Sequence, residues 1–225
     1  KLHKNKLKSG HLLGNRFAIT VTELSIPNDE ALHSAKAIVN RIVENGLPNF
    51  FGPQRFGSDG DNVQKALELI KGKRRINDRW LKRFLVSSYQ SYLCNYYLFR
   101  RIDSGAFDYL IKGDIAKKYD TGGMFEVKDL SAEQTRYEAH EISFTAPIYG
   151  PKMWKATGAV GKLEEEILAE SDITMSELEH MKVKGSRRIG RILTDINIEL
   201  TSQGLTVNFA LPKGAYATTV MREIM

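Results

Sequence analysis

Hydrophobic and polar residues alternate with a period of two near both ends of the chain. Phe17, Ile19 and Val21 alternate with small or polar residues, which is the pattern of a half-buried strand. Residues 196–200 and 205–209 alternate in the same way, and the residues between them can form a turn. The pattern therefore predicts one strand near the start of the chain and a β-hairpin near its end.

Between these strands, apolar residues recur mainly at helical spacing. The spacing predicts a helix capped by Asn28 and stopped by Gly46, and a shorter helix that begins at Asp61 or Asn62. A third helix should span roughly two dozen residues. Its predicted buried face consists of Trp80, Leu81, Phe84, Leu85, Tyr92, Leu93 and Tyr96.

Shorter helices are predicted from capping signals in the second half of the chain. Ser131 begins a weak Ser-x-x-Gln capping box, and Thr174 begins a Thr-x-x-Glu box that leads toward Met181. Residues 163–170 and 215–224 should form two more helices, and residues 109–144 mix short extended pieces with glycine-rich turns.

Extended segments at both ends with helices between them favour an α+β fold whose sheet domain is interrupted by a mainly helical insertion. We expect residues 1–46 and 190–225 to form the sheet domain and residues 47–189 to form the insertion. A chain of 225 residues is long enough for one large domain or two modest ones.

Composition narrows the function classes. The net charge of +6 and the pI near 9.3 are compatible with a polyanionic partner such as RNA. Cys94 is the sole cysteine, which excludes an internal disulfide and a thiolate zinc site and fits a reducing, cytoplasmic compartment. The five histidines lack metal-ligand spacing, so we expect no metal. No apolar run approaches the ~20 residues of a membrane helix, so we expect no membrane association.

Three motif blocks carry most of the information about function. Residues 47–57 (LPNFFGPQRFG) form a rigid aromatic loop, because two prolines restrict φ and two glycines permit turns. Together with Gly14-Asn15-Arg16-Phe17 and with residues 211–219 (LPKGAYATT), this loop closely resembles the pseudouridine synthase D family of RNA-modifying enzymes. Residues 87–93 and Gly113-Asp114 are weaker matches, and the resemblance covers nearly the whole chain.

The resemblance implies a catalytic pseudouridine synthase domain with a TRUD-type insertion, and the isomerisation of a uridine, uridine 13 in bacterial members, to pseudouridine in certain tRNAs. It also implies that Phe17 stacks on the target uridine and that Asn15 helps to hold the active-site geometry. An aromatic face offers an extracted base about 1–3 kcal/mol of stacking. No cofactor is required because substrate and product are isomers, and we expect a monomer whose partner is tRNA.

Several basic residues are candidates for RNA binding, each with a simpler alternative. Lys4, Lys6, Lys8 and Arg16 could neutralise phosphates or be solvated surface. Lys73, Arg74 and Arg75 have the same two interpretations. Arg55 could grip a phosphate, or it could satisfy carbonyl groups within its own loop. The phenylalanines of this loop are expected mainly to form a packed cluster at the junction between the domains.

The sequence departs from the family in one respect. The nucleophilic aspartate of the family lies in a Gly-x-Lys-Asp-like motif, and no such motif occurs in residues 1–225. Since Lys1 is not an initiator methionine, we expect these residues to lie within a longer gene product and to be inactive alone. The alternative hypothesis is a non-catalytic RNA-binding or structural fragment.

Overall fold

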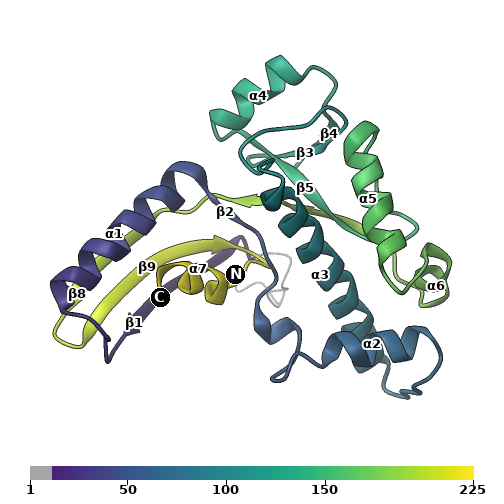
Figure 1. Cartoon of the computed structure of the whole chain (residues 1–225), viewed down its shortest axis with the longest axis horizontal. Helices are drawn as coiled ribbons and strands as arrows, with labels where there is room; N and C mark the ends of the chain where they lie inside the picture. The colour runs from purple at the N-terminus through teal and green to yellow at the C-terminus, as the bar shows by residue number, and fades with distance from the viewer. Residues whose placement is uncertain (1–11) are drawn as a thin grey trace, which may run out of the picture. The chain divides into compact units, whose positions relative to one another are not determined.

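The computed structural model describes residues 12–225, and the chain divides at two positions into two units (Figure 1). One unit contains the residues up to Leu47 together with Ile192–Met225, and the other contains Pro48–Arg191. The two expected boundaries, 46/47 and 189/190, lie close to these positions. At the two crossings the chain forms short strands, β2 (Leu47–Pro48) and β7 (Arg191–Ile192), which pair with each other.

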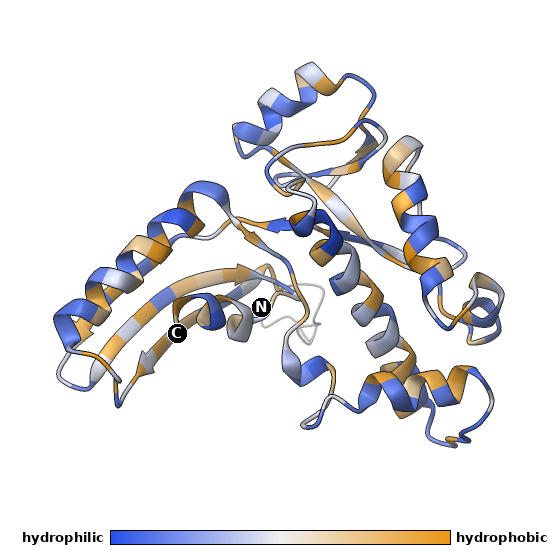
Figure 2. Ribbon diagram, viewed as in Figure 1, coloured by the Kyte–Doolittle hydropathy of each residue, from blue (hydrophilic) through white to orange (hydrophobic). Residues whose placement is uncertain are grey.

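The first unit is built on a three-stranded antiparallel sheet in the order β1 (Gly14–Val21), β9 (Gly204–Pro212) and β8 (Ile196–Thr201). The predicted strand and hairpin are therefore confirmed. Along β9 hydrophobic and hydrophilic residues alternate, as Figure 2 shows. Helices α1 (Asn28–Asn45) and α7 (Ala217–Ile224) contribute apolar residues to the same core as the buried residues of β9.

The second unit contains a four-stranded antiparallel sheet and more helix than strand. The sheet order is β4 (Met124–Glu126), β3 (Ile115–Lys118), β5 (Ile142–Ile148) and β6 (Ser186–Ile189). Around it lie α2 (Asn62–Ile70), α3 (Arg79–Asp103), α4 (Leu130–Glu138), α5 (Gly158–Glu170), α6 (Met175–His180) and the short 3₁₀ helix η2 (Pro53–Arg55). The α+β class is thus confirmed, and strand segments of three to seven residues build the sheet that the helical spacing did not reveal.

The helix ends test the predicted capping signals. At α6 both hydrogen bonds of the capping box are present, because Thr174 accepts from the Glu177 backbone N–H and Glu177 accepts from that of Thr174. At α1 the prediction was wrong, since Pro27 occupies the N-cap position and Asn28 is the first helical residue. Gly46 ends α1 with φ of 73°, as a residue without Cβ readily does.

Three other helices begin at positions that differ from the predictions. α4 is capped by the Asp129 carboxylate, which accepts from the Ala132 backbone N–H at 3.2 Å, and not by Ser131. Both residue types are good caps, so the sequence alone did not choose between them. α5 begins at Gly158, five residues before the predicted start, and α7 begins at Ala217, two residues after it.

The long helix α3 has the predicted length, 25 residues, but part of its predicted buried face was wrong. Trp80 is 71% exposed and Tyr92 is 45% exposed, whereas Leu85 and Leu93 are buried. The middle of α3 is buried on almost all sides by its neighbours, while its first turn extends beyond that packing. Exposure therefore varies along this helix as well as around it, and a periodic pattern detects only the second kind of variation.

Candidate functional site

Strand β1 places Asn15 and Phe17 on one face of the first unit's sheet. Side chains two positions apart in a strand share a face, and Phe17, Ile19 and Val21 pack against the core of this unit. The half-buried Phe17 ring stacks on Phe209 with 5.3 Å between ring centroids. Asn15 is exposed. The predicted pair therefore lies at the edge of this core, with Asn15 in contact with solvent and Phe17 half-buried.

The start of β1 fits closely against the end of β9. A Cβ on Gly14 would overlap the backbone oxygen of Leu211. The strand register sets Gly14 opposite Pro212 and Asn15 opposite Leu211. The backbone of the third motif therefore leaves space only for glycine at position 14 of the first motif. The two motif blocks form one local structure.

The third motif turns the chain from β9 into α7. Leu211 is buried, and Gly214 follows β9 with φ of 84°, a conformation that favours glycine. The Thr219 hydroxyl donates to the backbone oxygen of Tyr216 at 2.6 Å and steadies the first turn of α7. Gly214 thus ends the strand region, as predicted.

The aromatic loop of the second unit is fixed to one side of α3. Asn95 accepts from the Phe51 backbone N–H at 2.8 Å and donates to its carbonyl at 3.0 Å. Arg55 donates to the hydroxyls of Ser87 and Ser91, at 2.5 and 3.2 Å. These polar side chains recur every four residues along α3, so they occupy one stripe of that helix.

Arg55 is thus engaged by its own unit. Its guanidinium lies 5.1 Å from the centroid of the Phe84 ring and 5.8 Å from that of Phe51. Phe50 and Phe51 pack against the core of the second unit. Among residues 12–225 no carboxylate pairs with Arg55, and its predicted contact with RNA stays a prediction.

The basic run after α2 is partly neutralised. Arg74 pairs with Glu68 at 2.8 Å, and this hydrogen bond is the main cause that lowers the pKa of Glu68. Lys73 and Arg75 are exposed and make no ion pair within the described part of the chain. Arg16 is exposed on β1, and the predicted contacts Lys4, Lys6 and Lys8 lie outside the described residues.

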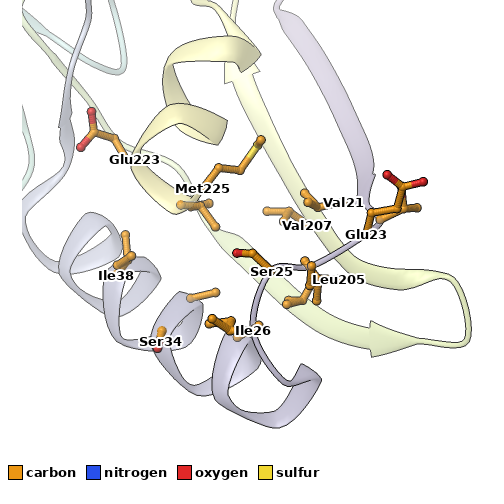
Figure 3. A pocket seen from close by; sticks show the side chains of 15 residues that line it. Val21, Glu23, Ser25, Ile26, Ser34, Ile38, Leu205, Val207, Glu223 and Met225 are labelled. Atoms are coloured by element: carbon orange, nitrogen blue, oxygen red, sulfur yellow. The ribbon is translucent and has the colours of Figure 1, made fainter.

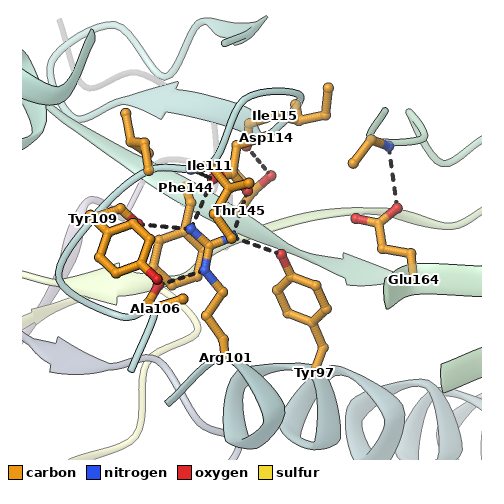
Figure 4. A network of polar contacts seen from close by, with 12 residues as sticks. Tyr97, Arg101, Ala106, Tyr109, Ile111, Asp114, Ile115, Phe144, Thr145 and Glu164 are labelled. Atoms are coloured by element: carbon orange, nitrogen blue, oxygen red, sulfur yellow. Dashed lines mark hydrogen bonds and ion pairs between the residues drawn. The ribbon is translucent and has the colours of Figure 1, made fainter. Parts of the chain in front are cut away.

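Asp114, of the Gly113-Asp114 motif, forms a fully buried ion pair with Arg101. Both oxygens of Asp114 accept from Arg101, at 2.7 and 2.8 Å, and neither side chain has exposed surface (Figure 4). Arg101 also donates to the Tyr97 hydroxyl and to the carbonyls of Ala106 and Tyr109. All five guanidinium N–H groups are therefore satisfied, and Asp114 is a structural residue rather than a catalytic one.

A second buried pair joins α5 to β6. Arg187 donates to Glu164 at 2.6 Å and to the side chain and carbonyl of Thr145 on β5. Burial raises the pKa of the Glu164 carboxyl, and the neighbouring Arg187 opposes this shift. Neither pair was visible in the sequence, because the partners lie on different elements and resemble surface charges.

A cavity of about 460 Å³ lies in the first unit at the far end of β1 (Figure 3). Its walls are the chain between Val21 and Ile26, part of α1, two residues of β9 and the end of α7. Glu23 and Glu223 are the charged side chains of its lining. It therefore offers no positive charge for a phosphate, and neither Asn15 nor Phe17 lines it.

Residues 12–225 contain neither a metal-binding cluster nor a membrane-spanning helix. No group of three His, Cys, Asp or Glu side chains in this range could hold a metal ion. No helix in it is long and apolar enough to cross a membrane.

The stripe of Ser87, Ser91 and Asn95 on α3 has a signal in the sequence. Polar residues repeat there every four positions within a helix that is otherwise rich in apolar residues. On a helix this spacing marks one polar line along a buried surface. Such a line predicts that another polar segment, here the aromatic loop, packs against it.

Comparison with known proteins gives a consistent result. The family model described as tRNA pseudouridine synthase D (TruD) matches residues 1–74 and 61–224. A tRNA pseudouridine synthase D of Thermus thermophilus is 40% identical over 100% of this chain and 61% of its own length. One from Anaeromyxobacter sp. (strain Fw109-5) is 37% identical over 99% of this chain and 64% of its own length.

A solved structure with the same family name is also similar to this chain. The crystal structure of a Methanosarcina mazei protein assigned as tRNA pseudouridine synthase D matches 96% of this chain and 69% of its own, with a TM-score of 0.77 and 25% identity. This chain spans about three fifths of the length of the relatives from Thermus and Anaeromyxobacter.

Proposed function

Because the chain belongs to the tRNA pseudouridine synthase D (TruD) family, we propose that it is part of an enzyme that isomerises a uridine of tRNA to pseudouridine. In this proposal the unit that contains β1 and β9 is part of the catalytic domain, and Pro48–Arg191 is the insertion. The target, by the family resemblance, is uridine 13.

The observation that carries the proposal is the pairing of β1 with β9. It joins the Gly14-Asn15-Arg16-Phe17 block to the Leu211-Pro212 block, with no space for a side chain at Gly14. Two blocks of the family pattern from opposite ends of the chain thus form one structure. If the two short motifs matched the family only by chance, they would not be expected to pack against each other in this way.

Asn15 and Phe17 have separate tasks in the proposed reaction. The half-buried Phe17 ring, backed by Phe209, stacks on the extracted uracil, and Asn15 on the same face holds the geometry around it. Stacking compensates for part of the cost of taking a base out of its stack. Arg16 points to the opposite face of β1 because adjacent side chains alternate, so it is assigned a phosphate contact away from the stacked uracil.

The reaction needs no co-reactant. The nucleophile attacks the sugar or the base, the bond between N1 and C1′ breaks, the uracil turns, and C5 bonds to C1′. The C5 proton leaves and N1 gains one, so product and substrate have the same composition. The Gly-x-Lys-Asp nucleophile is not in residues 1–225, and we therefore propose that these residues alone do not catalyse the isomerisation.

The test uses tRNA transcripts labelled with tritium at C5 of uridine. The complete gene product should release the label, because C5 loses its hydrogen, whereas residues 1–225 should not. Chemical mapping of pseudouridine should then place the product at position 13. Release by residues 1–225 would contradict the assignment of the nucleophile to another part of the protein.

The alternative, a non-catalytic RNA-binding fragment, is favoured by the missing motif alone. It predicts a gene product that binds tRNA, contains no Gly-x-Lys-Asp motif and releases no tritium. The same assay, combined with the sequence of the complete gene, decides between the two functions.

A further inference from the structure

An exposed tryptophan stands at the beginning of α3. Trp80 is 71% exposed, and its indole stacks on the Phe84 ring with centroids 5.3 Å apart and an angle of 8° between the planes. Phe84 covers one side of the indole, so the exposed surface includes the other side. A large flat apolar side chain in this position is available to a partner.

The stack is supported from within the second unit. The Arg55 guanidinium lies beside the Phe84 ring, 5.1 Å from its centroid, and is itself held by two serine hydroxyls of α3. Such cation–π contacts add to the packing of the rings. Trp80 therefore rests on a prepared support, and a ligand that stacks on it needs little reordering of the protein.

The residues that flank Trp80 in the sequence are mostly basic. Arg75, Arg79, Lys82 and Arg83 are exposed, and none makes an ion pair within the described part of the chain. Arg83 lies three positions after Trp80 and therefore one helical turn away on the same side. The Asp78 carboxylate, the nearest acidic group in the sequence, caps α3 by accepting from the Leu81 backbone N–H at 2.7 Å.

A second stacked pair on α3 provides a comparison. Tyr96 and Phe99 lie 6.5 Å apart with an angle of 11°, and Phe99 is 54% exposed. Here, however, the Tyr96 hydroxyl donates to Glu170, which also pairs with Arg100. The two pairs have similar geometry, but the cation beside Tyr96, Arg100, is neutralised by Glu170, whereas the arginines beside Trp80 in the sequence make no ion pair within residues 12–225.

We propose that Trp80 is a stacking platform for an unpaired base of RNA, and that Arg75, Arg79 and Arg83 neutralise the adjacent phosphates. Alternation of aromatic and cationic side chains is the chemistry that binds single-stranded nucleic acid without reading its sequence. This inference rests on the proposed function, since it assumes an RNA substrate. It adds a second nucleotide contact, separate from the reacting uridine assigned to Phe17.

The affinity test compares Trp80→Ala with Phe99→Ala in the complete chain of residues 1–225. The probes are an unmodified tRNA transcript and a 12-nucleotide oligouridylate, titrated over a range of NaCl concentrations. Trp80→Ala should weaken binding of both probes by about 5- to 150-fold, the equivalent of about 1–3 kcal/mol. Phe99→Ala should bind like the parent, and Trp80→Phe should recover part of the loss.

Salt dependence separates stacking from charge. Trp80→Ala should leave the slope of log K against log salt unchanged, because it removes no phosphate contact. Replacing Arg79 and Arg83 together by Gln should reduce the slope for the oligouridylate by about 1.4, from roughly 0.7 for each phosphate contact. In a Trp154→Phe background Trp80 is the sole tryptophan, and oligouridylate should quench its fluorescence.

The outcomes distinguish the two proposals. If the parent chain and the complete gene product both fail to bind tRNA, the proposed function and this inference fall together. If the parent binds and Trp80→Ala binds equally well, or if Phe99→Ala loses as much affinity, only the platform is refuted. Circular dichroism of each variant verifies that it is folded, as expected for substitution of two exposed side chains.

Discussion

Arg101 and Asp114 form a two-pronged ion pair with no exposed surface on either side chain. The arginine comes from α3 and the aspartate precedes β3, so the pair joins the central helix of the second unit to its sheet. The centroid of the Phe144 ring, on β5, lies 4.2 Å from the guanidinium carbon of Arg101. Arg101 therefore takes part in an ion pair, in hydrogen bonds and in a cation–π contact within the core of the second unit.

Asp114→Asn should destabilise the second unit by about 3–5 kcal/mol, because it leaves a guanidinium buried without its counter-charge. Both tryptophans lie in this unit, so urea unfolding followed by tryptophan fluorescence measures the effect. Glu68→Gln, which breaks the exposed pair with Arg74, is the control and should leave the midpoint unchanged. Equal midpoints for both variants would show that the buried pair is not needed.

Gly14→Ala should destabilise the first unit by about 1–3 kcal/mol, because the new Cβ collides with the backbone of Leu211. The far-ultraviolet circular dichroism transition should then begin at lower urea, while the tryptophan transition of the other unit stays in place. Gly123→Ala is the control, since its Cβ would meet its nearest neighbour at 3.4 Å. An unchanged dichroism transition for Gly14→Ala would contradict the close fit of β1 on β9.

Phe17→Leu in the complete enzyme should lower turnover by about 5- to 150-fold while tRNA affinity changes little, because leucine retains bulk against Phe209 but cannot stack on uracil. Tritium release gives turnover, and filter binding gives affinity. Full turnover with leucine at this position would remove Phe17 from the proposed site.

Cys94 should resist alkylation in the folded chain, because burial raises the pKa of its thiol from about 9 to about 12. As the sole cysteine, it gives an unambiguous signal with a thiol reagent at pH 8, slow in buffer and fast in urea. The raised pKa contributes stability that is complete below about pH 9 and is lost as the pH rises toward 12. Rapid labelling of the folded chain would contradict the enclosed position of Cys94.

The sequence predicted elements best where a regular period was long. α1, α2, α3 and the hairpin of β8 and β9 were expected from spacing and turn residues, and the structure contains them. Their ends were less certain, as at α4, because Asp129 and Ser131 are both good caps and only the tertiary context selects one.

The exposure of Trp80 could not be predicted from the pattern. Its position repeats with buried residues of α3, yet it belongs to the first turn of the helix, whose residues are exposed in the described part of the second unit. The pair of Glu164 and Arg187 was hidden for a related reason, since a charge on a strand or helix does not reveal whether its partner lies on another element. The exposure of Trp80 and the pairing of Glu164 with Arg187 both depend on contacts between secondary-structure elements. The residue pattern within a single element does not reveal such contacts.

The hydroxyls of Thr20 and Thr206 bond across β1 and β9 although 186 positions separate them in sequence. A ribosome therefore synthesises β1 long before β9, and Pro48–Arg191 emerges between the two strands. That continuous segment contains its own sheet and core, so it can fold during synthesis. The pairing of β1 with β9 can form only after β9 has been synthesised.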